Sequence, residues 1–186
     1  MKEYVICKAC GFVMEKAKLK DKCPACGVLA KMFEPSTERL SDKRRFLLSL
    51  DMHPVMVHFP QAFTASILVL ALLSLFVKGT LQQHFFSTIL VLAFCLPFTV
   101  LLTCASGLFD GQIRFRKVTT PLLQQKIVWG LAFLLLSLVV LALTQWYPLN
   151  SPAVIYGVII LTAVCLGCGT ILALYGVSLL NAKFPG

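Results

Sequence analysis

Four cysteines in two closely spaced pairs lie near the start of the chain. Cys7 and Cys10 form the first Cys-x-x-Cys pair, and Cys23 and Cys26 form the second. Each pair can chelate an ion from one loop, and four thiolates complete the tetrahedral shell that zinc and iron accept. A segment this short cannot bury enough apolar surface to fold alone, so the metal must contribute folding free energy. The spacing predicts one metal ion and leaves iron and zinc open.

The residues around these ligands resemble a known metal domain. Gly11 and Gly27 each follow the second cysteine of a pair, where a positive φ lets backbone N–H groups point at the sulfurs. The pattern YVICKACGF…KCPACGV…F, over about residues 2–34, resembles rubredoxin in the short form found at the end of rubrerythrins. The resemblance implies one iron, held by the four cysteines, that exchanges single electrons. The Lys-rich middle, MEKAKLKDK, departs from the family, and zinc ribbons share the spacing, so zinc stays an alternative.

Two of the three histidines lie where the first long apolar segment begins. His53 and His58 stand in the sequence HPVMVHFP, between two prolines. Imidazoles at a membrane can ligate haem, hold a quinone headgroup or pass protons, and the plain alternative is contact with lipid headgroups. Five residues along a helix differ by about 140° in direction, so these two histidines are not expected to share one haem. Haem b held by a single histidine stays open.

The same segment carries a second resemblance. HPVMVHFPQAF resembles the opening of an uncharacterised four-span membrane family with a His-Pro-x-x-Val-His-Phe-Pro signature, some of whose members are fused to rubredoxin-like heads. The resemblance depends on residues 53–60, with further support from SGLFDG at 106–111. Family members often carry a histidine at the start of the third span, where this chain has Gln124, Gln125 and Lys126. The absence of this histidine therefore argues against any proposed site that requires it.

Asp110 and Lys126 are charged residues beside the later apolar segments. Asp110 lies four residues before Arg114, a spacing that suits an ion pair on one helix. The alternative is a polar pocket shared by His58, Asp110 and Lys126 at one mouth of the bundle, because such clusters serve as proton relays in membranes. Together with His53, these residues form the predicted haem, quinone or proton site. No catalytic residue is assigned.

The four remaining cysteines lie inside apolar segments, at Cys95, Cys104, Cys165 and Cys168. Buried cysteine usually packs as a small apolar residue, and thiols without a nearby charge stay inert. We therefore expect packing roles for them. Because Cys165 and Cys168 share one helical face, dithiol or metal chemistry is the alternative.

The elements that must position these groups follow from an uneven composition. The 186 residues are 58% hydrophobic and 13% charged, which excludes an ordinary soluble enzyme, a disordered chain and a secreted disulfide scaffold. Four long apolar runs occupy about 55–77, 85–109, 127–147 and 152–180, and each supplies the ~20 residues of a bilayer-spanning helix. The sequence predicts an all-α membrane protein, a four-helix transmembrane bundle with a small N-terminal rubredoxin-like domain.

Three regions follow from this pattern. Residues 1–35 form the predicted metal-binding domain, 36–52 an amphipathic linker and 53–186 the four-helix transmembrane domain. Residues 1–53 hold 11 of the 17 Lys and Arg, and further basic residues cluster between the second and third apolar runs. The positive-inside rule then predicts a multi-pass cell (inner) membrane protein with both termini and the metal head cytoplasmic. Cytoplasmic thiols stay reduced, which argues against disulfides in the head.

These features predict a membrane-anchored electron-transfer protein. Single electrons would pass from a cytoplasmic donor protein through the iron centre to a quinone, haem or partner at the inner membrane face. No nucleotide-binding glycine motif is present, so the chain is expected to be a carrier or an oxidoreductase subunit rather than a stand-alone enzyme. Lipid, the donor and quinone are expected partners, a homodimer stays open, and nucleic acid is not expected. The alternative is a zinc-ribbon docking or regulatory membrane protein without redox activity.

Overall fold

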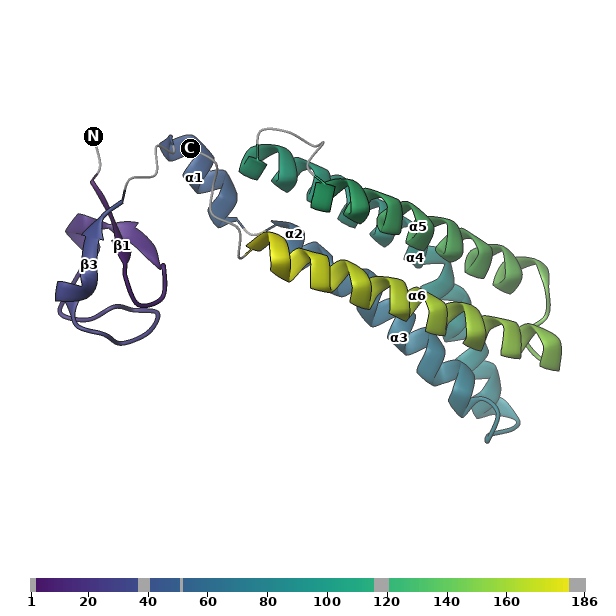
Figure 1. The fold of residues 1–186 in the computed structure, drawn as a ribbon. Coiled ribbons are helices and arrows are strands. Elements are labelled where there is room, and N and C mark those ends of the chain that lie inside the picture. Colours follow the sequence, from purple (N-terminus) through teal and green to yellow (C-terminus); the bar gives the residue numbers. More distant parts are fainter. Residues whose placement is uncertain (1–2, 37–40, 51, 116–120, 181–186) are drawn as a thin grey trace. The chain divides into compact units, whose positions relative to one another are not determined.

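The computed structural model describes residues 3–36, 41–50, 52–115 and 121–180. The chain divides into two compact units between Ser41 and Asp42. The first unit is a small head that contains the strands, and the second contains the long helices (Figure 1).

The head is a three-stranded antiparallel sheet in the order β2–β1–β3. Its elements are β1 (Tyr4–Cys7), β2 (Val13–Glu15) and β3 (Phe33–Pro35), with two short 3₁₀ turns, η1 (Lys16–Lys18) and η2 (Ala30–Met32). The central strand pairs Ile6 with Val13 on one side and Cys7 with Phe33 on the other. The first metal-binding cysteine therefore ends the central strand, and the loop between β1 and β2 carries the second.

The head buries very little apolar surface. Among its described residues, the buried hydrophobic side chains are Val5, Cys7 and Cys23. Two of these three are the cysteines of the predicted metal site. A domain this small needs a metal, disulfides or a partner to be stable, and here the cysteines stand where a core would be.

The second unit consists of two short helices and four long ones. Their bounds are α1 (Asp42–Ser49), α2 (Met52–Met56), α3 (His58–Leu73), α4 (Thr80–Phe115), α5 (Pro121–Trp146) and α6 (Pro152–Leu180). Figure 1 shows α3 to α6 side by side; α3 packs on α4 and α6, and α5 packs on the same two helices. Both α1 and α2 pack against α4. The predicted bundle of four long helices is confirmed.

Four helical segments are long and apolar enough to cross a membrane. They are Phe46–Leu73, Thr80–Arg114, Pro121–Trp146 and Pro152–Val177. The α4 helix has 36 residues and so is about 54 Å long, whereas the hydrocarbon core of a bilayer is about 30 Å thick. Helices α4 and α5 thus extend beyond the apolar runs in the sequence, because helical hydrogen bonding continues into polar residues at the ends.

The bundle has an interior of its own, in which small polar side chains are satisfied locally. Ile67, Ile89 and Val140 are fully buried. The buried hydroxyls of Thr64 and Thr162 donate to carbonyls of their own helices, Pro60 and Val158, each at 2.7 Å. A hydroxyl that bonds within its own helix avoids the cost of an unpaired polar group in an apolar medium.

Candidate metal centre

Two loops of the head repeat one backbone pattern around each Cys-x-x-Cys pair. In both loops, the N–H of the first cysteine donates to a carbonyl five residues later. The glycine after the second cysteine donates its N–H back to the first cysteine. The N···O distances are 2.9 Å (Cys7 to Phe12), 2.8 Å (Gly11 to Cys7), 2.8 Å (Cys23 to Val28) and 2.9 Å (Gly27 to Cys23). The two pairs are therefore held in equivalent ways.

Glycine is required in these loops by backbone conformation. Gly11 has φ +75° and Gly27 has φ +77°, in the left-handed region that other residues rarely adopt. A Cβ built on either glycine would meet no atom within 4 Å. Space is available at both positions, so the dihedral angle alone explains the residue type.

The four sulfurs are spaced as a tetrahedral metal site requires. The Sγ atoms of Cys7, Cys10, Cys23 and Cys26 all lie within 4.8 Å of one another. Two of the Sγ···Sγ distances, Cys7 to Cys26 and Cys10 to Cys23, are 3.8 Å. A tetrahedron with metal–sulfur bonds of about 2.3 Å has edges of about 3.8 Å. A disulfide bond measures about 2.05 Å, so these cysteines are thiols that fit one metal ion.

The cluster has a buried side and an exposed side. Cys7 and Cys23, the first cysteines of the two pairs, are only 1% and 3% exposed. Cys10 and Cys26, the second cysteines, are exposed. A partner molecule can therefore approach the site from the side of Cys10 and Cys26.

Before a metal binds, the thiols differ in acidity because their surroundings differ. Loss of hydration raises the pKa of the Cys23 thiol, but the backbone N–H groups of Cys26 and Ala25, together with hydrogen bonds to the Cys26 and Cys10 thiols, lower it to about 7. For Cys10, the N–H of Phe12 lowers the pKa, whereas loss of hydration and the other three thiols raise it, to about 12. Since metal ions bind thiolates, Cys23 is better prepared than Cys10 to bind a metal near neutral pH.

The lysines of the head include some that form ion pairs with glutamates and two exposed ones close to the second cysteine pair. Lys16 bonds Glu3 at 2.8 Å, and Lys18 bonds Glu15 at 3.2 Å. These ion pairs are exposed on the lysine side, so each contributes little to stability. Lys20 and Lys22, which precede the second cysteine pair, are exposed.

The comparisons identify the head. Residues 6–34 match the family model of the rubrerythrin rubredoxin-like domain, a range that contains all four cysteines. No curated protein and no solved structure matches the chain. The chain thus carries a rubredoxin-like metal site attached to a four-helix membrane-span region, and the family of the helical part is not identified.

The polar residues predicted for the membrane part are only partly brought together. The ring of His53, in α2, lies between α4 and α5. Its Nδ1 is 3.3 Å from Ser106 Oγ, and its Nε2 is 3.2 Å from Lys126 Nζ. A Cβ on Gly107 would come within 2.9 Å of the His53 ring, so this approach depends on glycine. His58, the first residue of α3, is exposed.

Donor and acceptor chemistry fixes the protonation of His53. Lysine only donates, so Lys126 donates to Nε2, and the ring proton must sit on Nδ1. Nδ1 then donates to Ser106 Oγ, whose own hydroxyl donates to the Thr103 carbonyl at 2.8 Å. Both ring nitrogens of His53 are engaged in this chain of hydrogen bonds. A haem iron would have to displace Lys126 or Ser106 to reach either one.

The C-terminal end of α4 carries the other charged contacts. Asp110 Oδ2 lies 3.8 Å from Arg114 Nε, at the helical spacing noted in the sequence. Arg44 of α1 donates Nε to the Ile113 carbonyl at 2.7 Å and Nη2 to the Arg114 carbonyl at 2.8 Å. Arg44 thus caps α4, whose last carbonyls have no partner within the helix. The sequence offered only a basic cluster, Lys43 to Arg45, as a signal for this contact.

The remaining cysteines lie in the bundle. Cys165 and Cys168 are buried among the core residues of the bundle, while Cys95 and Cys104 are half-buried. The Cys104 sulfur lies 3.2 Å from the position that a Cβ on Gly130 would take. This close approach to a glycine favours the packing role for Cys104.

Proposed function

We propose that this protein is a membrane-anchored electron carrier whose head holds one iron ion between Cys7, Cys10, Cys23 and Cys26. The observation that carries the proposal is the pair of equivalent cysteine loops, with sulfurs spaced for a tetrahedral ion, in a segment similar to a rubredoxin-like domain. Iron held by four thiolates exchanges one electron between its ferric and ferrous states, whereas zinc has no redox chemistry.

The residues of the head divide the tasks of such a carrier. Cys7 and Cys23 lie on the buried side, where they attach the site to the interior of the head. Cys10 and Cys26 form the exposed edge at which a donor protein would dock. The exposed Lys20 and Lys22 beside the second pair suit a donor with an acidic surface. The donor is a protein in this proposal, because the chain has no nucleotide-binding glycine motif.

The membrane part holds the head at the bilayer and offers a site for the acceptor. The basic residues before the first span and around Lys126 favour a cytoplasmic head and a cytoplasmic Lys126 end of the bundle. We propose that the electron acceptor is a quinone or a partner protein at this inner face. The lysine N–H groups could then bond a carbonyl oxygen and supply a proton. Haem b at His53 is less favoured, since both ring nitrogens are engaged.

Reoxidation of the reduced head in proteoliposomes tests this proposal. The full chain in vesicles is reduced with dithionite, excess reductant is removed without oxygen, oxidised short-chain quinone or buffer alone is then added, and the return of the oxidised absorption is followed. We expect quinone to accelerate reoxidation and Lys126→Met to slow the quinone-dependent rate at least tenfold. Lys78→Met, which removes an exposed lysine beyond α3, is the matched control. Equal rates with and without quinone, or in Lys126→Met and the control, would reject this acceptor site.

The second candidate function is a docking or regulatory membrane protein with a zinc ribbon in place of the iron site. The cysteine loops fit zinc as well as iron, because zinc accepts the same four thiolates, and it is the similarity of residues 6–34 to a rubredoxin-like domain that favours iron. The identity of the bound metal separates the two functions.

A further inference from the structure

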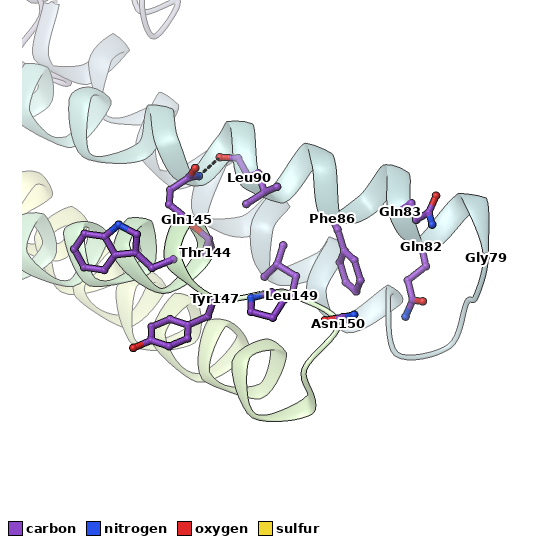
Figure 2. Close-up of a pocket in the computed structure, with 12 residues that line it drawn as sticks. Gly79, Gln82, Gln83, Phe86, Leu90, Thr144, Gln145, Tyr147, Leu149 and Asn150 are labelled. Atoms are coloured by element: carbon purple, nitrogen blue, oxygen red, sulfur yellow. Dashed lines mark hydrogen bonds between the residues drawn. The ribbon is translucent and has the colours of Figure 1, made fainter.

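A pocket opens at the end of the bundle opposite to His53 and Lys126. Its volume is about 620 Å³, and its lining comes from the α3–α4 connection, the first turns of α4, the last turn of α5 and the α5–α6 connection (Figure 2). Pockets of roughly 300–1,000 Å³ are typical of small-molecule sites. The pocket is therefore large enough for the headgroup of a membrane molecule.

Side-chain amides supply the polar part of the lining, at Gln82, Gln83, Gln145 and Asn150. Gln145 Nε2 donates to the Leu90 carbonyl at 3.3 Å, as Figure 2 shows, and Gln82 Nε2 donates to the Ser74 carbonyl at 2.8 Å. An amide has two N–H hydrogens and a carbonyl oxygen. One hydrogen bond to the backbone orients the amides of Gln82 and Gln145. Each of these two amides can still bond a ligand through its second N–H hydrogen and its carbonyl oxygen.

The rest of the lining is largely apolar and aromatic. Phe86 and Leu149 stand between the amides of Gln82 and Gln145 in Figure 2. Trp146 also lines the pocket and is 79% exposed, so it lies at the outer surface of the bundle. None of the residues that line the pocket is Asp, Glu, Lys, Arg or His. A charged ligand would lose part of its hydration here without gaining an opposite charge, which argues against ions and anionic headgroups.

We propose that this pocket binds the headgroup of an uncharged amphiphile that carries carbonyl or hydroxyl oxygens. The amides bond the oxygens, Phe86 contacts the body of the headgroup, and the tail leaves past Trp146 into the bilayer. A quinone and a neutral glycerolipid both have this chemistry. The location at the ends of two membrane-spanning segments gives a membrane molecule direct access. The proposal is independent of the proposed electron transfer.

Tryptophan fluorescence tests the proposal directly. The chain has two tryptophans, so Trp129→Phe leaves Trp146 as the single reporter in the pocket. The full-length protein in phosphatidylcholine nanodiscs is titrated with a short-chain quinone and, separately, with dioleoylglycerol. We expect saturable quenching by quinone or a saturable shift of the emission by dioleoylglycerol. Gln83→Leu and Asn150→Ala should each weaken binding at least fivefold.

The control variant and the two ligands decide among the outcomes. Gln125→Leu changes another exposed amide, on α5 at the far end of the bundle, and should leave binding unchanged. Saturation by quinone alone identifies a quinone site, and saturation by dioleoylglycerol alone identifies a lipid site. Linear quenching that is equal in all variants would overturn the proposal, as would saturation by phosphatidylglycerol alone. Circular dichroism confirms that each variant is folded.

Discussion

At the scale of single residues, the sequence predicts the functional residues of the head far more completely than those of the membrane part. The spacing of Cys7 to Cys26 and the glycine after each pair specify both the ligands and their backbone, because each loop closes locally. The partner of Lys126 could not be foreseen in this way. Val57, between α2 and α3, keeps helical dihedral angles (φ −64°, ψ −23°), and five residues along a helix differ by about 140° in direction, so His53 meets Lys126 while His58 is exposed. Such long-range pairs depend on helix packing.

Gly27→Ala tests the conformational role of the loop glycines. Because Gly27 has φ +77° and no atom would crowd its Cβ, only the left-handed backbone opposes the change. We expect a loss of about 1–2 kcal/mol in metal affinity or head stability, measured by chelator competition on the full chain. Gly27→Asn is the control, since Asn tolerates this conformation better and should lose less. Equal losses in both variants would show that the added side chain, rather than the backbone conformation, causes the loss of metal affinity or head stability.

At the scale of elements, apolar run length was enough to predict the four long helices, but not the short ones. A run of about 20 apolar residues in lipid must be helical, since no other structure satisfies its backbone. The attachment of α1 to α4 by Arg44 leaves no comparable trace in the sequence. The end of α2 at Met56 does leave one, because Pro60 has no N–H for the Met56 carbonyl, which accepts from the Thr103 hydroxyl instead. The full lengths of α4 and α5 also exceed their apolar runs, because hydropathy reports lipid contact rather than helical hydrogen bonds.

Gly107→Ala tests the contact between α2 and α4. A Cβ at this position would meet the His53 ring at 2.9 Å and push it away from Ser106 and Lys126. We expect a loss of about 1–3 kcal/mol in the stability of the bundle, measured by unfolding in mild detergent. Gly167→Ala in α6 is the matched control, because its Cβ would meet nothing within 4 Å.

A double variant sharpens this test. In a His53→Ala background the ring is absent, so Gly107→Ala should lose its cost or become slightly stabilising. If Gly107→Ala costs the same free energy of unfolding with and without His53, then Gly107 is not required for the close approach of the His53 ring to α4.

At the scale of the whole molecule, the chain joins two units with different sources of stability. The head buries few apolar side chains besides its own ligands, whereas the bundle has a continuous apolar core. The composition already separated a charged head from an apolar body, and so the division into two units could be predicted. The geometry between helices could not, since it depends on which small residues face each other.

Metal removal should therefore unfold one unit and spare the other. After treatment with a thiol-reactive mercurial and a chelator, we expect rapid amide exchange and proteolysis within residues 3–36. The exchange of α3 to α6 and the helical circular dichroism should stay unchanged. Loss of helix in step with metal release would contradict the independence of the two units.

The most direct test of the account is the metal content and absorption spectrum of the full-length protein, air-oxidised and then reduced with dithionite. The account predicts about one iron per chain, as a four-thiolate site requires, and visible bands that bleach on reduction. Cys10→Ser combined with Cys26→Ser should abolish the bands, while Cys165→Ser should leave them intact. A colourless protein with one zinc, even from iron-rich growth medium, would contradict electron transfer and leave the docking function.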